Sequence, residues 1–437
     1  MKSRKVIIRK CETYSVDKIT AIIKAAMAEL NETPEGNILI KPNVVTANKG
    51  YIHHAYTEPR VVESMVAALR DQNQKAAITI GESGGIGIPT RMFFSDAGYY
   101  ELGKKLNVPV VDFNEEETVT VPLAKAKWHH TMQVAKSLHE ADYKIWMPKL
   151  KFHIVAQITN ALKLNMGILT HAERFIFHDD RLNEKIVDLL EVGHPDLIVS
   201  DAVIIGKGFE SSPYPVDLGA LIISNDPIAM DMAAARILNY SPREVLHLVE
   251  AAERGYGSLD FDDIDISGDI SIEALAEKTK GIESAFQDLS KVDTPVAFYE
   301  GINPATGNLC YGGCACSIKG VLGTAEKKYP GTLAKAKPGA IVMGYYRGDV
   351  IHPGQTVAFV GDCTEVEGRL EAEKVVRFKG CPSKVKDLMI FMLHHFRIKS
   401  PALDLKNMVL LIYHSIIKAW MQLSVPLRKK AKILKKQ

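Results

Sequence analysis

The strongest constraint on the fold is a regular alternation of short β-branched runs with amphipathic segments over the first 255 residues. Residues 6–9 and 37–41 have the composition of strands, and residues 16–30 between them have the spacing of a helix. Such strand–helix–strand repeats form parallel sheets that helices cover. We therefore expect an α/β fold with a mostly parallel sheet and flanking helices. The same patterns predict further strands at 76–80, 108–112, 143–147, 197–202 and 220–224, and helices at 59–72, 158–165, 183–192 and 227–238.

A change of composition toward glycine and cysteine near residue 292 predicts a second domain. The length of 437 residues suits two or three domains of roughly 100 to 200 residues each. We place the α/β domain at residues 1–291 and a smaller cysteine-rich lobe at residues 292–400. An amphipathic helix with a basic tail is expected at residues 401–437.

The charge distribution limits the classes of partner. The net charge is +2, but residues 428–437 hold six cations and no acid, so the remainder of the chain has a charge of −4. This removes the electrostatic basis for binding nucleic acid. The N-terminal residues lack the apolar run and cleavage pattern of a signal peptide, which predicts a cytoplasmic protein. Six polar residues interrupt the longest apolar stretch, residues 405–423, so no transmembrane helix is expected.

The cysteines point to a metal site. Cys11 stands alone, whereas the other five fall in one short region, which is typical of metal ligands in a reducing compartment. Glycines between the first of these thiols let the backbone fold closely around a cluster. We expect four of the five to bind a [4Fe–4S] cluster, with structural zinc or merely buried or reactive thiols as alternatives. The candidate metal ligands are Cys310, Cys314, Cys316, Cys363 and Cys381.

Residues that follow the predicted strands supply a candidate binding site, because ligands of parallel α/β sheets bind beyond the carboxyl ends of the strands. In an extended backbone, Lys149, Lys151 and His153 point the same way. Two ammonium groups and an imidazole on one face favour a small anionic substrate such as a carboxylate, phosphate or enolate. The alternative is a solvated basic edge. The candidate substrate-binding residues are Lys41, Ser83, Lys149, Lys151, Lys163 and Arg174.

Two residues are candidates for catalysis. His153 is expected to transfer protons, because its unperturbed pKa is near 6.5. Asp201 lies at the end of a buried strand and is the second candidate. Asp226, which precedes Pro227, is expected to cap a helix instead. The spacing of His171, Arg174 and His178 is that of one helical face, with a metal, a substrate or solvent as its contact.

Several short segments, taken together, resemble the domain of unknown function 362 family over about residues 5–255. They are residues 41–43 (KPN), 57–63 (TEPRVVE), 81–83 (GES), 148–153 (PKLKFH), 161–167 (ALKLNMG) and 225–231 (NDPIAMD). The resemblance implies an α/β fold and an association with iron–sulfur proteins, commonly through an attached ferredoxin-like module. The cysteines at 310–381 do not have ferredoxin spacing. The resemblance therefore implies a cofactor context and leaves the reaction open.

These features predict an iron–sulfur-cluster-binding redox enzyme that acts on a small anionic substrate, with an electron-transfer protein as partner. The alternative is a non-redox ligand-binding module, or a metal-dependent isomerase or lyase, with a structural metal in the cysteine lobe. Five histidines leave room for a second metal in the α/β domain: His53, His54, His153, His171 and His178.

An apolar stripe at helical spacing precedes the basic tail and must bury itself against something. We expect it to pack on the protein itself or on a second subunit in a homodimer. The alternative is a weak peripheral contact with a membrane, with the cations facing anionic lipid. The stripe consists of Leu405, Met408, Val409, Ile412, Ile416, Ala419, Trp420 and Leu423.

Overall fold

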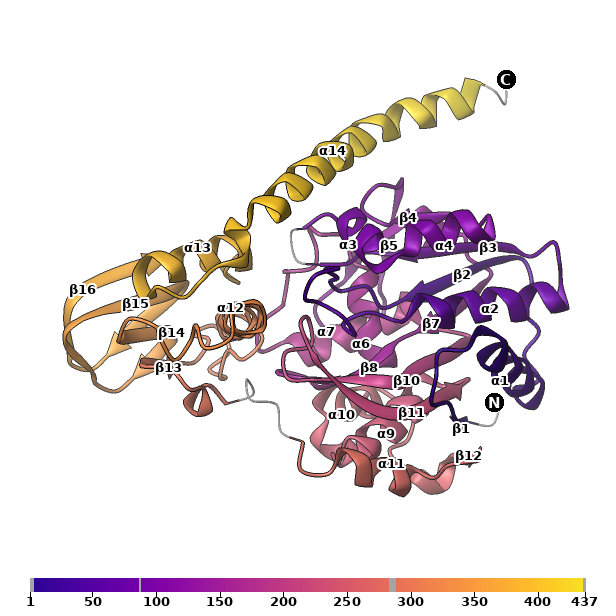
Figure 1. Cartoon of the computed structure of the whole chain (residues 1–437), viewed down its shortest axis with the longest axis horizontal. Helices are drawn as coiled ribbons and strands as arrows, with labels where there is room; N and C mark the ends of the chain where they lie inside the picture. The colour runs from indigo at the N-terminus through magenta and orange to yellow at the C-terminus, as the bar shows by residue number, and fades with distance from the viewer. Residues whose placement is uncertain (1–3, 86–87, 283–287, 435–437) are drawn as a thin grey trace.

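The computed structural model describes residues 4–85, 88–282 and 288–434, with side chains of the last helix described as far as Pro426. A large sheet with helices on both faces forms an α/β body, and a separate sheet with two helices forms a small unit beside it (Figure 1). A long helix, α14 (Leu405–Leu434), runs from the small unit along the body and beyond it. Most cations of the tail lie outside the described side chains.

The large sheet confirms the predicted fold class. Its main path has the strand order β12-β1-β11-β10-β7-β2-β3-β4, and neighbours are parallel from β10 to β4. Strand β11 is antiparallel to both of its neighbours. The strands are β1 (Lys5–Lys10), β2 (Asn37–Pro42), β3 (Ala77–Glu82), β4 (Val110–Asp112), β7 (Tyr143–Met147), β10 (Leu197–Lys207), β11 (Tyr214–Ser224) and β12 (Asp265–Gly268); β8 (Lys149–His153) joins β10, and β9 (Gln157–Thr159) joins β8.

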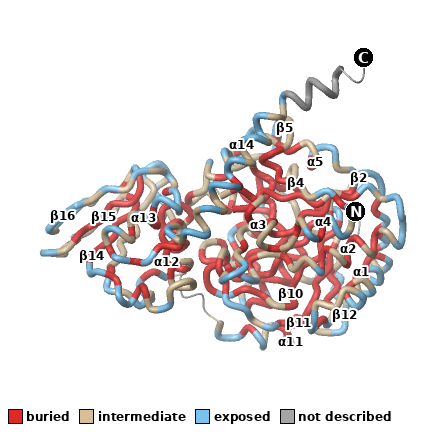
Figure 2. The backbone as a smooth tube through the Cα atoms, turned by 45° about the horizontal axis from the view of Figure 1, so that its top comes forward, coloured by how far each residue is buried: buried red, intermediate tan, exposed pale blue. Residues whose placement is uncertain are grey.

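Both faces of this sheet are buried, which explains the continuous apolar runs of its strands. In β1, Ile7 enters one core while Val6 and Ile8 enter the other. Figure 2 shows the buried backbone concentrated in the body. One face carries α1 (Val16–Leu30), α2 (Pro59–Gln72), α3 (Thr90–Ala97) and α4 (Tyr99–Leu106), and the other carries α6 (Ala161–Leu164), α7 (Leu182–Asp188), α9 (Pro227–Ile237), α10 (Leu246–Glu253) and α11 (Ile272–Thr279). The body also contains the hairpin β5 (Thr118–Pro122) and β6 (Thr131–Ala135) and the short helices α5 (Lys136–His139) and α8 (Leu190–Gly193).

Two expected helical segments differ in the structure. The predicted helix at 158–165 begins late, because the β-branched Ile158 and Thr159 pair with β8 as part of β9. The helix α6 starts only where the Asp231 carboxylate accepts the backbone N–H groups of Ala161 at 2.7 Å and Leu162 at 3.0 Å. Residues 171–178 form turns, so the three basic residues there do not share a helical face.

The small unit contains four parallel strands in sequential order. Gly339 of β14 pairs with Thr356 of β15, and Thr356 pairs with Lys374 of β16. Each strand therefore lies beside the preceding strand and runs in the same direction. The apolar faces of α12 and α13 pack against this sheet in a core of their own. The elements are β13 (Val296–Glu300), α12 (Cys314–Lys328), β14 (Gly339–Arg347), β15 (Val350–Glu367), β16 (Leu370–Phe378) and α13 (Val385–Phe396).

The cap of α9 provides a test of the fold. The Asp226 carboxylate accepts the Ala229 N–H at 2.6 Å, as the sequence predicts, and Pro227 begins the helix. We expect Asp226→Ala to lower the free energy of unfolding by about 1 kcal/mol, because it leaves an N–H of the first turn unpaired. Urea unfolding followed by circular dichroism measures this loss. Asp226→Ser keeps an acceptor and should lose less, so equal losses in the two variants would contradict a capping role.

Candidate functional site

Four thiols of the small unit lie close to one another. Cys310 precedes α12, Cys314 begins it, Cys363 lies in β15 and Cys381 follows β16. Burial, and then the neighbouring Cys314 thiol, raise the pKa of Cys310 to about 12. Burial, and then the thiols of Cys314 and Cys363, raise the pKa of Cys381 to about 11. Four parts of the chain therefore bring their thiols within electrostatic reach of each other.

Glycines make this approach feasible. A Cβ atom added at Gly313 would lie 2.7 Å from the Cys310 Sγ, and one added at Gly361 would lie 2.7 Å from the Cys314 Sγ. Any larger residue at these positions would collide with a sulfur. The Ser383 hydroxyl also donates to the Cys314 Sγ, at 3.4 Å.

Cys316 is separated from this group. It lies on α12 two residues after Cys314, which turns its side chain by roughly 200° around the helix axis. Burial, and then the Glu210 carboxylate of the body, raise its pKa to about 12, whereas Lys163 acts in the opposite direction. The fifth thiol thus faces the α/β body. Among the described residues, no three His, Cys, Asp or Glu side chains are placed to share one metal ion.

The loop that carries Cys310 is fixed to the body by Asp180. The Asp180 carboxylate accepts from the Asn303 amide at 2.8 Å and from the Thr306 hydroxyl at 2.6 Å, and its backbone carbonyl accepts from the Tyr311 hydroxyl at 2.7 Å. His178 Nδ1 lies 2.8 Å from the Gly312 carbonyl oxygen. These contacts place the thiols next to the polar side chains of the body.

The nearest polar side chains form a buried cluster around Lys151. Its ammonium donates to the backbone carbonyls of Ala55 at 2.7 Å and Glu210 at 3.1 Å. Burial, against the opposing charge of Glu210 and with the charge of Lys163, lowers the pKa of Lys151 to about 7. Burial likewise lowers the pKa of Lys163 and raises that of Glu210. Protons in this cluster are therefore held less strongly by the lysines, and more strongly by the glutamate, than in water.

The backbone sets the protonation of His153. Its Nδ1 accepts the N–H groups of Val155 at 3.0 Å and Ala156 at 3.1 Å, so the ring proton resides on Nε2. Nε2 lies 3.4 Å from the Glu210 Oε1. Burial, and then the charges of Lys163 and Lys151, lower the pKa of His153 well below its usual value. His153 is thus a neutral imidazole that presents an N–H, rather than a ring nitrogen free to accept a proton.

Some buried polar atoms of this cluster lack partners among the described residues. They are the Glu210 Oε2, the Thr159 Oγ1 and the Ser212 Oγ. Thr159 is the strand partner of Lys151, and Ser212 follows Glu210 by two residues. A buried polar atom without a hydrogen bond costs stability, so these atoms favour a polar ligand.

Lys149 and Asp201 form a separate ion pair, and both are also hydrogen-bonded to other groups of the body. Their charged groups lie 2.8 Å apart, and the Tyr14 hydroxyl lies 2.8 Å from the lysine Nζ and 3.0 Å from a carboxylate oxygen. The other carboxylate oxygen also accepts the Glu58 N–H at 3.0 Å. The charge of Lys149 still lowers the pKa of Lys151, so these two neighbours on β8 are close.

Lys41, Ser83 and Arg174 are also held by ion pairs or hydrogen bonds within the body. Lys41 forms a buried ion pair with Glu82. The Arg174 guanidinium donates to the Ser83 carbonyl, to the Ser83 hydroxyl at 2.7 Å and to the Gly85 carbonyl. Arg174 therefore closes the glycine-rich turn after β3.

Three of the histidines considered for a second metal form hydrogen bonds with different partners. His171 Nε2 lies 2.8 Å from the Gly84 carbonyl oxygen, and its Nδ1 lies 2.7 Å from the Lys418 ammonium. His178 contacts the cysteine loop, and His153 contacts backbone N–H groups. The described residues therefore supply no shared site for these rings.

The structure brings Lys151, Lys163 and His153 together, pairs Lys149 with Asp201 instead, and adds Glu210, which the sequence patterns did not indicate. Glu210 follows β10 and satisfies the strand-end rule that identified the lysines. The strand was expected to end at residue 202, whereas β10 continues to Lys207. Because the strand was expected to end five residues earlier, Glu210 was not among the residues expected at a strand end.

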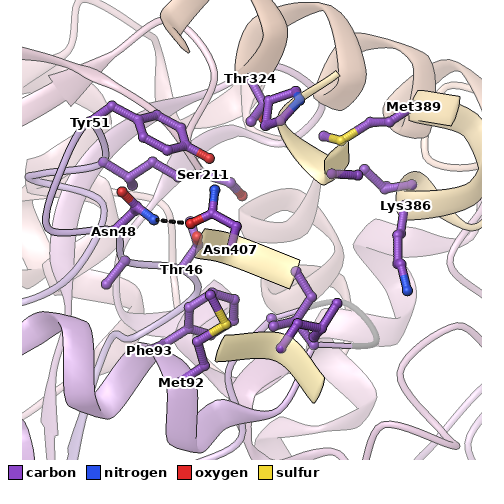
Figure 3. Close-up of a pocket in the computed structure, with 18 of the residues that line it drawn as sticks. Thr46, Asn48, Tyr51, Met92, Phe93, Ser211, Thr324, Lys386, Met389 and Asn407 are labelled. Carbon is purple, nitrogen blue, oxygen red and sulfur yellow. Dashed lines mark hydrogen bonds between the residues drawn. The ribbon is translucent and has the colours of Figure 1, made fainter. Parts of the chain in front are cut away.

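Two pockets lie in this part of the structure, and one of them borders the cluster. His153 lines a pocket of about 290 Å³ together with Gln157, Tyr240 and Glu244. An apolar pocket of about 170 Å³ lies where the body, the small unit and α14 meet. Figure 3 shows Phe93 of the body and Met389 of the small unit among its lining side chains. His153 is thus the cluster residue that lines a pocket, whereas Lys151 is completely buried.

Comparison with known proteins bears on the family. Among curated proteins, none matches this chain. Solved structures with some likeness include the lactate racemase apoprotein from Thermoanaerobacterium thermosaccharolyticum, at 11% identity and a TM-score of 0.37, covering 77% of this chain and 68% of that one. A protein from Thermotoga maritima has 12% identity and a TM-score of 0.34, covering 52% of this chain and 59% of the other. At these scores neither likeness carries a conclusion about activity.

The family model described as Domain of unknown function (DUF362) matches residues 38–236. This range runs from β2 to the end of α9 and includes Lys151, His153, Lys163 and Glu210. The match confirms the resemblance found in the sequence motifs. Residues 38–236 of the α/β body are thus similar to the DUF362 family.

Proposed function

We propose that this protein is an iron–sulfur redox enzyme that acts on a small anionic substrate bound at the Lys151 cluster. The observation that supports the proposal best is the sorting of the five thiols. Cys310, Cys314, Cys363 and Cys381 lie together, whereas Cys316 faces Glu210 and Lys163. Four thiolates are the ligand set of a [4Fe–4S] cluster.

Thiolates suit such a cluster, as they also suit the structural zinc ion of the alternative. Gly313 and Gly361 let the backbone lie directly against the Cys310 and Cys314 sulfurs, as the backbone around a bound cluster would. When bound, the cluster would supply single-electron transfer, and an electron-transfer protein would be its partner.

The residues of the body would hold and orient the substrate. Lys151 and Lys163 would bind an anionic group, since charge-assisted hydrogen bonds in a buried site are strong. Neutral His153 would donate its Nε2–H to an oxygen on which negative charge develops. Glu210, whose pKa is raised by burial, would carry the proton that this oxygen gains or loses.

A non-redox alternative rests on the same pair of groups. Burial brings Lys151 to a pKa of about 7 and raises the pKa of Glu210, so the pair can exchange protons at neutral pH without any change of oxidation state. In that case the protein would be an isomerase or lyase, and the metal of the small unit would be structural.

Cys314 and Cys316 should differ in their effect on the iron content. We expect protein purified anaerobically to contain iron and acid-labile sulfide and to show a cluster signal in electron paramagnetic resonance after reduction. Cys314→Ser should lose the iron and the visible absorbance, because it removes a ligand. Cys316→Ser should keep both, because this thiol faces the body.

Cys316→Ser is the matched control, since it makes the same chemical change two residues away on α12. Iron loss in Cys316→Ser together with iron retention in Cys314→Ser would contradict the assignment. Stoichiometric zinc without iron or sulfide would remove the redox proposal and leave the non-redox alternative.

The second prediction concerns the charge of Lys151. Sulfate keeps its charge over the relevant range, so its affinity should fall as the pH rises from about 6 to about 8, as Lys151 loses its proton around its pKa of about 7. Lys151→Met should weaken sulfate binding by about tenfold or more at the lower pH and remove the pH dependence. Isothermal titration calorimetry on the cluster-loaded protein gives both quantities.

Lys207→Met is the control, because it removes an exposed lysine at the end of β10. Its sulfate affinity and pH profile should match those of the unchanged protein. A pH profile that persists in Lys151→Met would show that another group binds the anion.

A further inference from the structure

The amphipathic helix α14 is oriented with its apolar side outward. Its large apolar residues have exposed fractions between 58% and 76%. At roughly 100° per residue, they fall within an arc of about 100° on the helix surface. An ordinary surface helix buries such an arc on its own protein. The residues are Leu405, Val409, Ile412, Tyr413, Ile416, Trp420 and Leu423, and we call them the outer face.

Polar contacts hold the opposite side of α14 on the body. The Asn48 amide donates to the Asn407 side-chain oxygen at 3.2 Å, the Lys418 ammonium lies 2.7 Å from the His171 Nδ1, and the Gln422 amide donates to the Asn114 carbonyl at 3.0 Å. These anchors extend over four turns of the helix. The helix is therefore fixed with the outer face turned away from the protein.

Charge distinguishes the partners that could cover the outer face. Residues 405–437 contain eight lysines and arginines and no aspartate or glutamate. Two copies of this segment side by side would bring like charges together, whereas a surface of anionic lipid would attract them. The apolar arc and the cationic tail follow one another along the same helix, as in proteins that bind the membrane interface.

We propose that α14 docks the protein on a membrane that contains anionic lipid, with the outer face in the interfacial region and the helix parallel to the membrane plane. Trp420 would lie at the level of the headgroups. By length and composition, residues Leu405–Pro426 are able to cross a membrane, which differs from the expectation based on their polar residues. The body contacts of Asn407, Lys418 and Gln422 oppose a span, because a crossing helix would have to release all three.

Asn407, Met408 and Leu411 of α14 line the apolar pocket from the body-facing side of the helix, and Figure 3 shows Asn407 there. The inference concerns the helix alone and does not depend on the proposed redox function.

The test is flotation of the full chain with vesicles of phosphatidylcholine that contain phosphatidylglycerol, compared with vesicles of phosphatidylcholine alone. We expect the chain to float with the anionic vesicles at low ionic strength, and to be released at high ionic strength as the charges are screened. The fluorescence of Trp420 should shift to shorter wavelength on binding, and this shift should vanish in Trp420→Phe, which should still float. Leu423→Glu should reduce the bound fraction at least tenfold.

Leu246→Glu is the matched control, because it makes the same change at an exposed leucine of α10, away from the outer face. It should float like the unchanged protein. Equal flotation of Leu423→Glu and the unchanged protein would overturn the proposal. Binding that resists high salt and an alkaline carbonate wash would show a membrane span instead. A lipid-free dimer that Leu423→Glu converts to a monomer would assign the outer face to a second copy.

Discussion

The burial of positive charge at the carboxyl edge of the sheet is the constraint on which the rest of the structure depends. Strand β8 carries Lys149, Lys151 and His153, and all three are almost completely buried. Removing charges from water is costly unless partners are supplied. Asp201 supplies one on β10, where it is the strand partner of Lys149. This pair holds β8 against the central sheet and leaves Lys151 beside it in a site with few counter-charges.

The same strand brings the body and the small unit together. Behind β8, the polar cluster reaches Cys316 of α12 through Lys163 and Glu210. Asp180, on the turn that precedes α7, binds the loop that precedes α12. Body and small unit thus meet over these polar groups and over an apolar contact of Ile154 and Phe209 with α12. Such proximity is what electron transfer between a cluster and a bound substrate requires, and it is the physical basis of the proposed function.

The C-terminal helix α14 combines hydrogen bonds on its inner side with exposed apolar residues on its outer side. Its inner side exchanges water for hydrogen bonds with Asn48, His171 and Asn114, while its apolar side remains in solvent. Apolar surface exposed on this scale is costly in water at roughly 25 cal/mol per Å². That cost makes the outer face the part of the protein best suited to a new contact.

Much of the fold was determined by local sequence. Strand and helix positions in the body follow from periodicity, and the Asp226 cap follows from the residues around Pro227, because these features depend on neighbours along the chain. The apolar stripe of α14 is likewise visible in its spacing. Tertiary structure alone decided which groups meet. The direction in which Cys316 faces, the place of Glu210 beside Lys151 and the outward direction of the stripe depend on contacts between segments far apart in the sequence. The ion pair of Lys149 with Asp201 depends on the pairing of β8 with β10. Burial removes from water the groups that the folded chain brings together, and their spacing along the sequence does not show which groups these are.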